Sequence, residues 1–243
     1  MQRNEIFDLA ARKSFSFDDF YTASQNSGLS LGEAAMRKKL QELLKNGDIV
    51  RVGRNAYCVP SRPVQYYQYS YSTQARNVAT IMMETYPAIR FSIFEIVQLN
   101  EFINHQLAHD VLFLSVEEEL MDFVFGTMKE HFPGKVMLNP TLELYHQYWY
   151  EGMIVIDKLV TEAPKDRDVP WHTRLEKMLV DLLSNPILAG SISESEIPTV
   201  FEEAFSKYII DESSLLRYAK RRSAENRLRT VIREKTDITL RTE

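Results

Sequence analysis

The spacing of apolar side chains predicts three helices at the start of the chain. The clearest helix follows Ser30, where Glu33 three residues later completes a capping box, and it ends before Gly47. Two earlier helices are indicated over residues 4–13 and from Ser16 onward. The apolar stripe of the clearest helix consists of Met36, Leu40, Leu43 and Leu44.

A hairpin pattern follows the third helix directly. Two short β-type runs, residues 49–52 and 56–59, are joined by Gly53, Arg54 and Asn55, and Gly and Asn both tolerate the positive φ of a tight turn. Three helices and a hairpin are the parts of a winged helix, in which the third helix enters the major groove of DNA. The pattern therefore predicts a winged helix-turn-helix DNA-binding domain over residues 1–62.

The rest of the chain, residues 63–243, alternates between strand-like and helical patterns and becomes wholly helical after Pro170. This order predicts a mixed α/β C-terminal domain that ends in a helical bundle, and an α+β (mixed) class for the whole protein. An early helix is indicated over residues 73–85 and a short one over 98–106. The strand-like runs are residues 89–96, 111–116, 135–139 and 152–160, and the later helices are 173–183, 196–207, 212–222 and 224–234.

The charge is distributed unevenly between these two parts. Residues 1–65 carry ten Lys and Arg against seven Asp and Glu, a net +3, whereas residues 66–243 carry nineteen against twenty-seven, a net −8. No apolar run reaches the roughly 20 residues that a membrane span needs. The N-terminus lacks the pattern of a signal peptide, and Cys58 is the single cysteine of the chain, so a cytoplasmic protein without disulfides or membrane contact is expected.

Basic and amide side chains occupy the polar side of the third predicted helix and the hairpin. Arg and Lys bind phosphates or guanine, and Gln pairs with adenine, so these residue types suit double-stranded DNA. Two alternatives stay open at this stage: a basic helix face that is merely solvated, and a winged helix that binds proteins. The candidate DNA-binding residues are Arg37, Lys38, Gln41, Lys45, Arg51 and Arg54.

A second basic stretch lies near the C-terminus, over residues 217–235, where only Glu225 and Glu234 oppose the positive charges. It is interpreted either as a second phosphate-contacting surface, as a docking face for an acidic protein, or as the solvated side of a helical bundle. Its candidate residues are Arg217, Arg221, Arg222, Arg227, Arg229 and Arg233.

The order of these parts resembles the AbiEi-type antitoxins of bacterial abortive-infection systems. The resemblance rests on the hairpin sequence GDIVRVGRNAY, the helix Leu175–Leu183 and the segment Leu215–Ala219. It implies a transcriptional autoregulator that binds inverted repeats in its own promoter and counteracts a nucleotidyltransferase-like toxin encoded next to it. The family commonly has Arg-Thr where this chain has Glu176, Lys177 and Met178, which indicates either a close relative or a divergent branch of the family.

No pattern in the sequence indicates an enzyme, and neither catalytic residues, a cofactor nor a metal site are predicted. Asp157 and Lys158 resemble part of a nuclease motif, but adjacent residues of a strand face opposite sides. His105 and His109 have the i, i+4 spacing of metal ligands without the intervening Glu of a zinc protease. Two alternatives to the antitoxin therefore remain: a regulator with a ligand- or protein-sensing domain and no toxin partner, and a metal-dependent nuclease.

Overall fold

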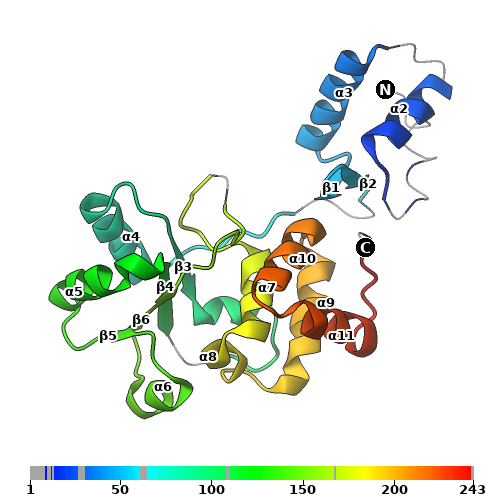
Figure 1. Ribbon diagram of the computed structural model, residues 1–243. Coiled ribbons are helices and arrows are strands. Elements are labelled where there is room, and N and C mark those ends of the chain that lie inside the picture. The colour runs from blue at the N-terminus through cyan, green and yellow to red at the C-terminus, as the bar shows by residue number, and fades with distance from the viewer. Residues whose placement is uncertain are drawn as a thin grey trace.

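The computed structural model describes residues 9, 12, 14–26, 31–60, 65–107, 110–166 and 168–241, with the side chain of Lys45 left out. It has the mixed α+β class that the sequence predicts. A small N-terminal lobe stands on a larger body, in which a mixed sheet is covered by helices on both faces (Figure 1). The helix predicted over residues 4–13 lies largely outside the described residues.

The described part of the N-terminal lobe contains two helices, α2 and α3, and a hairpin in the predicted order. Met36, Leu40 and Leu43 are buried, as the apolar stripe requires, and pack with Phe15 and Phe20 in a separate core. The lobe comprises α2 (Phe17–Asn26), α3 (Glu33–Asn46), β1 (Val50–Gly53) and β2 (Ala56–Cys58).

The two ends of α3 compare differently with the sequence prediction. Gly47 has a φ of 74°, and its N–H donates to the carbonyls of Leu43 and Leu44, as expected for a left-handed helix cap. The predicted capping box is wrong, because the N-cap is Gly32 and Glu33 is therefore the first helical residue rather than the third. Ser30 itself lies outside the described residues.

The central sheet has the strand order β3-β4-β6-β5, with β3 antiparallel to β4 and the other pairs parallel. Each strand falls within a run that the sequence predicts. The parallel strands place their carboxyl ends at one edge of the sheet. The four strands are β3 (Phe91–Glu95), β4 (Val111–Val116), β5 (Val136–Leu138) and β6 (Met153–Lys158).

The two faces of the sheet pack against different helices because successive side chains of a strand point in opposite directions. Leu112 and Leu114 of β4 pack with α4 (Thr73–Thr85) and α5 (Met121–His131). Phe113 packs on the other face with the C-terminal helices. Those helices are α7 (Leu175–Ser184), α8 (Pro186–Ala189), α9 (Ile197–Lys207), α10 (Glu212–Arg221) and α11 (Glu225–Lys235).

Shorter elements connect these layers. The helix predicted over residues 98–106 is a 3₁₀ helix that begins earlier, at Ile96, and ends at Glu101. The remaining short elements are η2 (Glu118–Leu120), α6 (Leu142–Tyr148) and η3 (Glu194–Glu196). Across the described ranges, no helix is long and apolar enough to cross a membrane.

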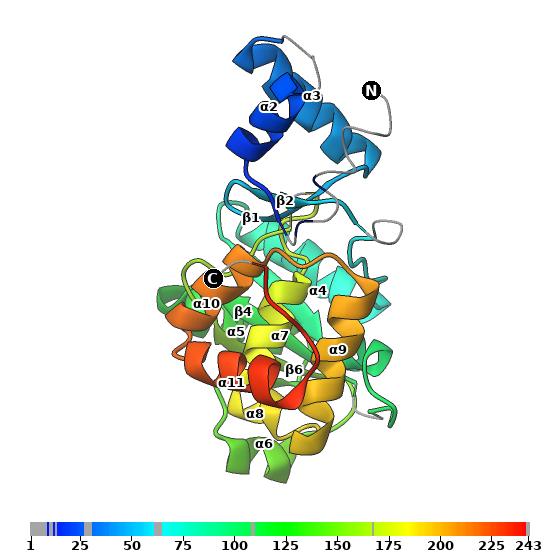
Figure 2. The ribbon, with the colours of Figure 1, turned by 90° about the vertical axis from the view of Figure 1, so that its right-hand side faces the viewer.

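The hairpin of the N-terminal lobe lies against the body of the protein (Figure 2). Val50, Val52 and Cys58 form a small buried cluster, and Ile209 of the body packs on it. The guanidinium of Arg241 donates to Cys58 Sγ at 3.1 Å. The hairpin is therefore held between the core of its own lobe and the C-terminal helices. The predicted domain boundary at 62/63 falls within residues 61–64, which lie outside the described residues.

Candidate nucleic-acid interface and a buried charged cluster

The exposed side of α3 carries three of the six candidate DNA-binding residues. Arg37, Lys38 and Gln41 are exposed there, opposite the buried Met36 and Leu40. The side chain of Lys45 lies outside the described residues. Lys38 and Gln41 are exposed on this side of the helix, so their polar groups are accessible to a large ligand.

Arg37 is less available than its neighbour Lys38. Its Nη2 lies 2.6 Å from Glu33 Oε1, and its guanidinium carbon is 4.2 Å from the centre of the Phe17 ring. These contacts connect the start of α3 to α2 and partly neutralise the Arg37 charge. Lys38 and Gln41 are therefore the better candidates for direct contact with DNA.

The two candidate arginines of the hairpin are both exposed. Arg51 is the outward residue of β1, and its Nε donates to the carbonyl of Gly53 at 3.0 Å. Arg54 occupies the turn, where its backbone N–H donates to Ser213 Oγ of α10 at 3.2 Å. The hairpin thus presents two cations while its apolar side chains are buried.

Three of the six arginines of the predicted second basic surface bind residues outside their own helix. Arg221 donates to Thr161 Oγ1 at 2.8 Å, and Arg227 donates to the Leu183 carbonyl at 2.8 Å. Arg229 and Arg233 form ion pairs with Glu225 and Glu234, Arg217 is exposed, and Arg222 turns inward. Arg221, Arg222 and Arg227 therefore connect the C-terminal helices to other parts of the body.

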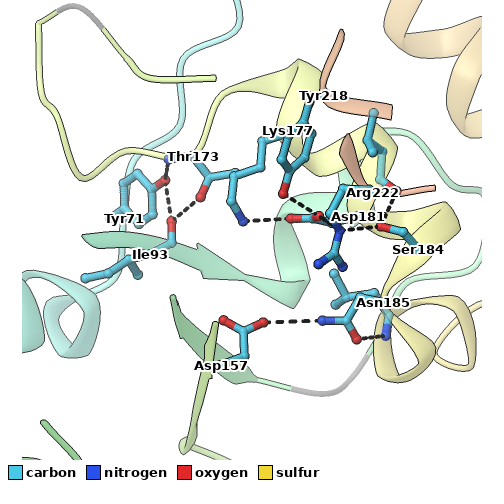
Figure 3. Close-up of polar contacts among 12 residues, drawn as sticks. Tyr71, Ile93, Asp157, Thr173, Lys177, Asp181, Ser184, Asn185, Tyr218 and Arg222 are labelled. Atoms are coloured by element: carbon cyan, nitrogen blue, oxygen red, sulfur yellow. Dashed lines mark hydrogen bonds and ion pairs between the residues drawn. The ribbon is translucent and has the colours of Figure 1, made fainter. Parts of the chain in front are cut away.

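Arg222 belongs to a polar group inside the body, which we call the charged cluster: Asp157, Lys177, Asp181, Tyr218 and Arg222. Asp181 is its centre (Figure 3). The Asp181 carboxylate lies 2.7 Å from Lys177 Nζ, accepts the Tyr218 hydroxyl at 2.9 Å and lies 3.3 Å from Arg222 Nε. These contacts join α7 to α10.

The helix α7 supplies the middle of this cluster although nearly all of it is buried. It packs against α8, α9, α10 and α11. Within the helix, Lys177 and Asp181 form an ion pair at i, i+4 spacing. Their side chains are 6% and 9% exposed. A second charged residue pair lies at the start of the helix, where Glu176 Oε1 accepts from Arg174 at 2.7 Å and from the Asp211 N–H at 2.8 Å.

Asp157 belongs to β6 and lies on the sheet face that packs against the C-terminal helices. Its Oδ2 accepts the side-chain N–H of Asn185 at 3.3 Å, whereas Oδ1 is buried without a hydrogen bond of normal geometry in the described part of the chain. Burial raises the pKa of Asp157, against the opposing effects of the nearby Lys177 ammonium and Ser115 hydroxyl. Lys158 points the other way and pairs with Glu118, as the alternation of a strand predicts.

Only one member of the histidine pair, His105, lies within the described residues. His105 is exposed and its Nδ1 lies 3.1 Å from Glu196 Oε1, while His109 lies outside the described residues. Within the ranges that the structure covers, no three His, Cys, Asp or Glu side chains are grouped as metal ligands.

Sequence reasoning missed the charged cluster. The sequence does contain an indication of this cluster in the helix Leu175–Leu183. There, Glu176, Lys177 and Asp181 interrupt an otherwise apolar segment. Charged residues on a helix that is apolar on all sides must find partners when they are buried. The identity of those partners, which come from β6 and α10, depends on contacts between residues far apart in the sequence.

The arrangement defines a class of protein: a mixed α+β chain with a hairpin-bearing helical lobe on a three-layer body. Residues 35–238 match the family described as a family of unknown function, DUF6577, and the chain belongs to that family. The match includes most of α3, the hairpin and the whole central sheet.

Two further comparisons add little to this assignment. No curated protein matches the chain. Among solved structures, the RV2827C protein from Mycobacterium tuberculosis aligns with 96% of this chain and 80% of its own, at 10% sequence identity and a TM-score of 0.24. A TM-score this low indicates neither a shared fold nor a shared function.

Proposed function

We propose that the N-terminal lobe is a winged helix that binds double-stranded DNA. One observation carries this proposal: the exposed side of α3 bears Lys38 and Gln41, and the hairpin that follows immediately exposes Arg51 and Arg54. A helix of this kind reads base edges in the major groove, and basic hairpin residues contact phosphates or the minor groove. The net charge of −8 over residues 66–243 favours contact through the lobe rather than the body.

The test is fluorescence anisotropy with a labelled duplex from upstream of the protein's own gene and a scrambled duplex of equal length. Affinity for both should fall as salt rises, because each phosphate contact releases counterions. Lys38→Ala should weaken binding to both duplexes and reduce the salt slope by about 1, whereas Gln41→Ala should mainly reduce the preference for the specific duplex.

The control is Lys129→Ala, which removes an exposed lysine from α5 on the opposite side of the body. Its DNA affinity should equal that of the unmodified protein. Absence of binding at low salt would reject the proposal. Equal losses in the Lys38 and Lys129 variants would show that the overall charge of the protein, rather than the position of Lys38 on α3, determines binding.

A more specific role rests on the resemblance to AbiEi-type antitoxins. In this role the protein represses its own promoter by binding inverted repeats and neutralises a nucleotidyltransferase-like toxin encoded next door. Expression of the adjacent gene alone and together with this chain tests the second half. A neighbour that is harmless by itself would favour a regulator without a toxin, and a promoter reporter unaffected by the chain would reject autoregulation.

A further inference from the structure

A cleft of about 310 Å³ opens beside the charged cluster. It lies at the carboxyl ends of β5 and β6, the position at which sheets with parallel strands generally bind their ligands. Its volume is at the lower end of the range for sites that bind small molecules. The polar residues that line it include Asn139, Thr141, Asp157, Ser184, Asn185 and Arg222.

The backbone at the mouth of the cleft has an unusual conformation. Asn139 follows β5 directly, is exposed and has a φ of 40°, which residues other than Gly adopt infrequently. Its N–H donates to the Ile156 carbonyl of β6 at 2.8 Å, so this conformation is fixed by the sheet. The next element, α6, begins after Thr141, whose hydroxyl oxygen caps it and whose hydroxyl hydrogen is available to an acceptor.

Arg222 offers the cleft a guanidinium with spare donors. Its Nε donates to Ser184 Oγ at 2.8 Å and faces Asp181, and these two contacts fix the side chain. No described residue accepts a hydrogen bond from its two terminal nitrogens within normal geometry. Figure 3 shows the guanidinium between Asp181 and Asn185. A guanidinium held in this way matches the two oxygens of a phosphate or carboxylate group.

The charged side chains around the cleft include equal numbers of cations and carboxyl groups, so the unused donors of Arg222 rather than a net charge point to an anion. Lys177 and Arg222 both lie against the carboxylate of Asp181, and Asp157 supplies a second carboxyl group close to both cations. Burial raises the pKa of Asp157, whereas the nearby Lys177 and Arg222 lower it. Lys158, also in the lining, is paired with Glu118 and adds no net charge.

We infer that this cleft binds a small molecule through a phosphate or carboxylate group, with the terminal nitrogens of Arg222 as its principal donors. Thr141 and Asn139 are placed to supply further hydrogen bonds from the mouth. The inference does not depend on DNA binding by the N-terminal lobe.

Isothermal titration calorimetry of the 243-residue chain tests this inference. One arm uses inorganic phosphate and the other uses acetate, both at the same ionic strength. Saturable binding at one site per chain is expected in at least one arm, and the arm that binds more tightly identifies the anion class. Arg222→Gln should weaken this binding at least about tenfold, the effect of losing a charge-assisted contact. Arg221→Gln is the matched control, because the guanidinium of Arg221 donates to Thr161 outside the cleft. The affinity of this variant for the anion should equal that of the unmodified chain.

A third variant, Arg222→Lys, keeps the charge beside Asp181 but loses the planar fork, and circular dichroism reports whether each variant folds. The Arg222→Lys variant should bind the anion several-fold more weakly than the unmodified chain does. If Arg222→Gln fails to fold, the Lys variant decides the matter. No saturable binding in either arm, or equal affinity of the unmodified chain and the Arg222→Lys variant, would overturn the inference.

Discussion

The backbone N–H of Arg54 donates to Ser213 Oγ at 3.2 Å, across 159 positions of sequence. This bond joins the turn of the hairpin to the first turn of α10. Arg222, the residue that follows the last turn of α10, lies in the charged cluster. One helix therefore contacts the proposed DNA-binding lobe at one end and the cleft at the other.

Replacing Ser213 with alanine should loosen the hairpin. The expected loss of stability is about 0.5–1.5 kcal/mol, because the Arg54 N–H then lacks its protein acceptor. Hydrogen exchange should become faster at Arg54 and along β1 and β2. Ser206→Ala is the control, since this α9 hydroxyl bonds only within its own helix at the Glu203 carbonyl. Identical exchange in both variants would mean that the contacts of the hairpin with Ile209 and Arg241 hold it without this bond.

The two sides of α3 should respond differently to truncation. Leu40 is 3% exposed in the lobe's core, so Leu40→Ala should destabilise the protein by about 2–5 kcal/mol through lost packing. Lys38→Ala should change stability by less than about 0.5 kcal/mol, as expected for a surface position. Urea denaturation followed by circular dichroism measures both values. A large loss in the Lys38 variant would show that this side of α3 is packed against other groups.

Two lysines with the same i, i+4 spacing to a carboxylate should differ in their importance. Lys177 pairs with Asp181 at 2.7 Å inside the protein, whereas Lys207 pairs with Glu203 at 2.9 Å and is 42% exposed. Lys177→Met should cost about 3–5 kcal/mol because it removes a buried partner of Asp181. Lys207→Met should cost about 0–1 kcal/mol. Equal effects in denaturant titrations would contradict the assigned burial of the cluster.

Stability should depend on pH through Glu176. Burial raises the pKa of its carboxyl, despite the lowering effect of Arg174, so the folded state binds a proton more tightly than the unfolded state does. The resulting stabilisation is fully present below the unfolded pKa of about 4 and is lost as pH rises through the raised folded pKa. The difference in unfolding free energy between the unmodified chain and Glu176→Gln should therefore fall as pH increases from 4.

Denaturant titrations of both chains over this pH range measure the difference, and other titrating groups cancel in the comparison. A difference that increases with pH would mean that the pairing with Arg174 lowers the pKa of Glu176 instead.

The sequence determined most of the secondary structure, because alternation of apolar residues in strands and their helical spacing are local properties. The strand β4 and the helix α4 coincide with runs predicted from these patterns. The start of α3 did not, because its side-chain composition allowed a cap at Ser30 and the chain instead enters the helix at Gly32. The resemblance to AbiEi-type antitoxins and the proposed DNA contacts remain predictions.

The sequence by itself determined the exposed polar side of α3 and the hairpin after it, since both follow from the spacing of residues along one segment. Only the tertiary structure decided which arginines face solvent and which bind within the protein. Arg221 and Arg222 are adjacent in the sequence, yet the first bonds to Thr161 and the second turns toward Asp181. Their environments differ because successive residues on a helix point in directions about 100° apart, and α10 is buried on one side alone. The same packing brings Asp157 of β6 to the cluster and leaves the cleft beside it.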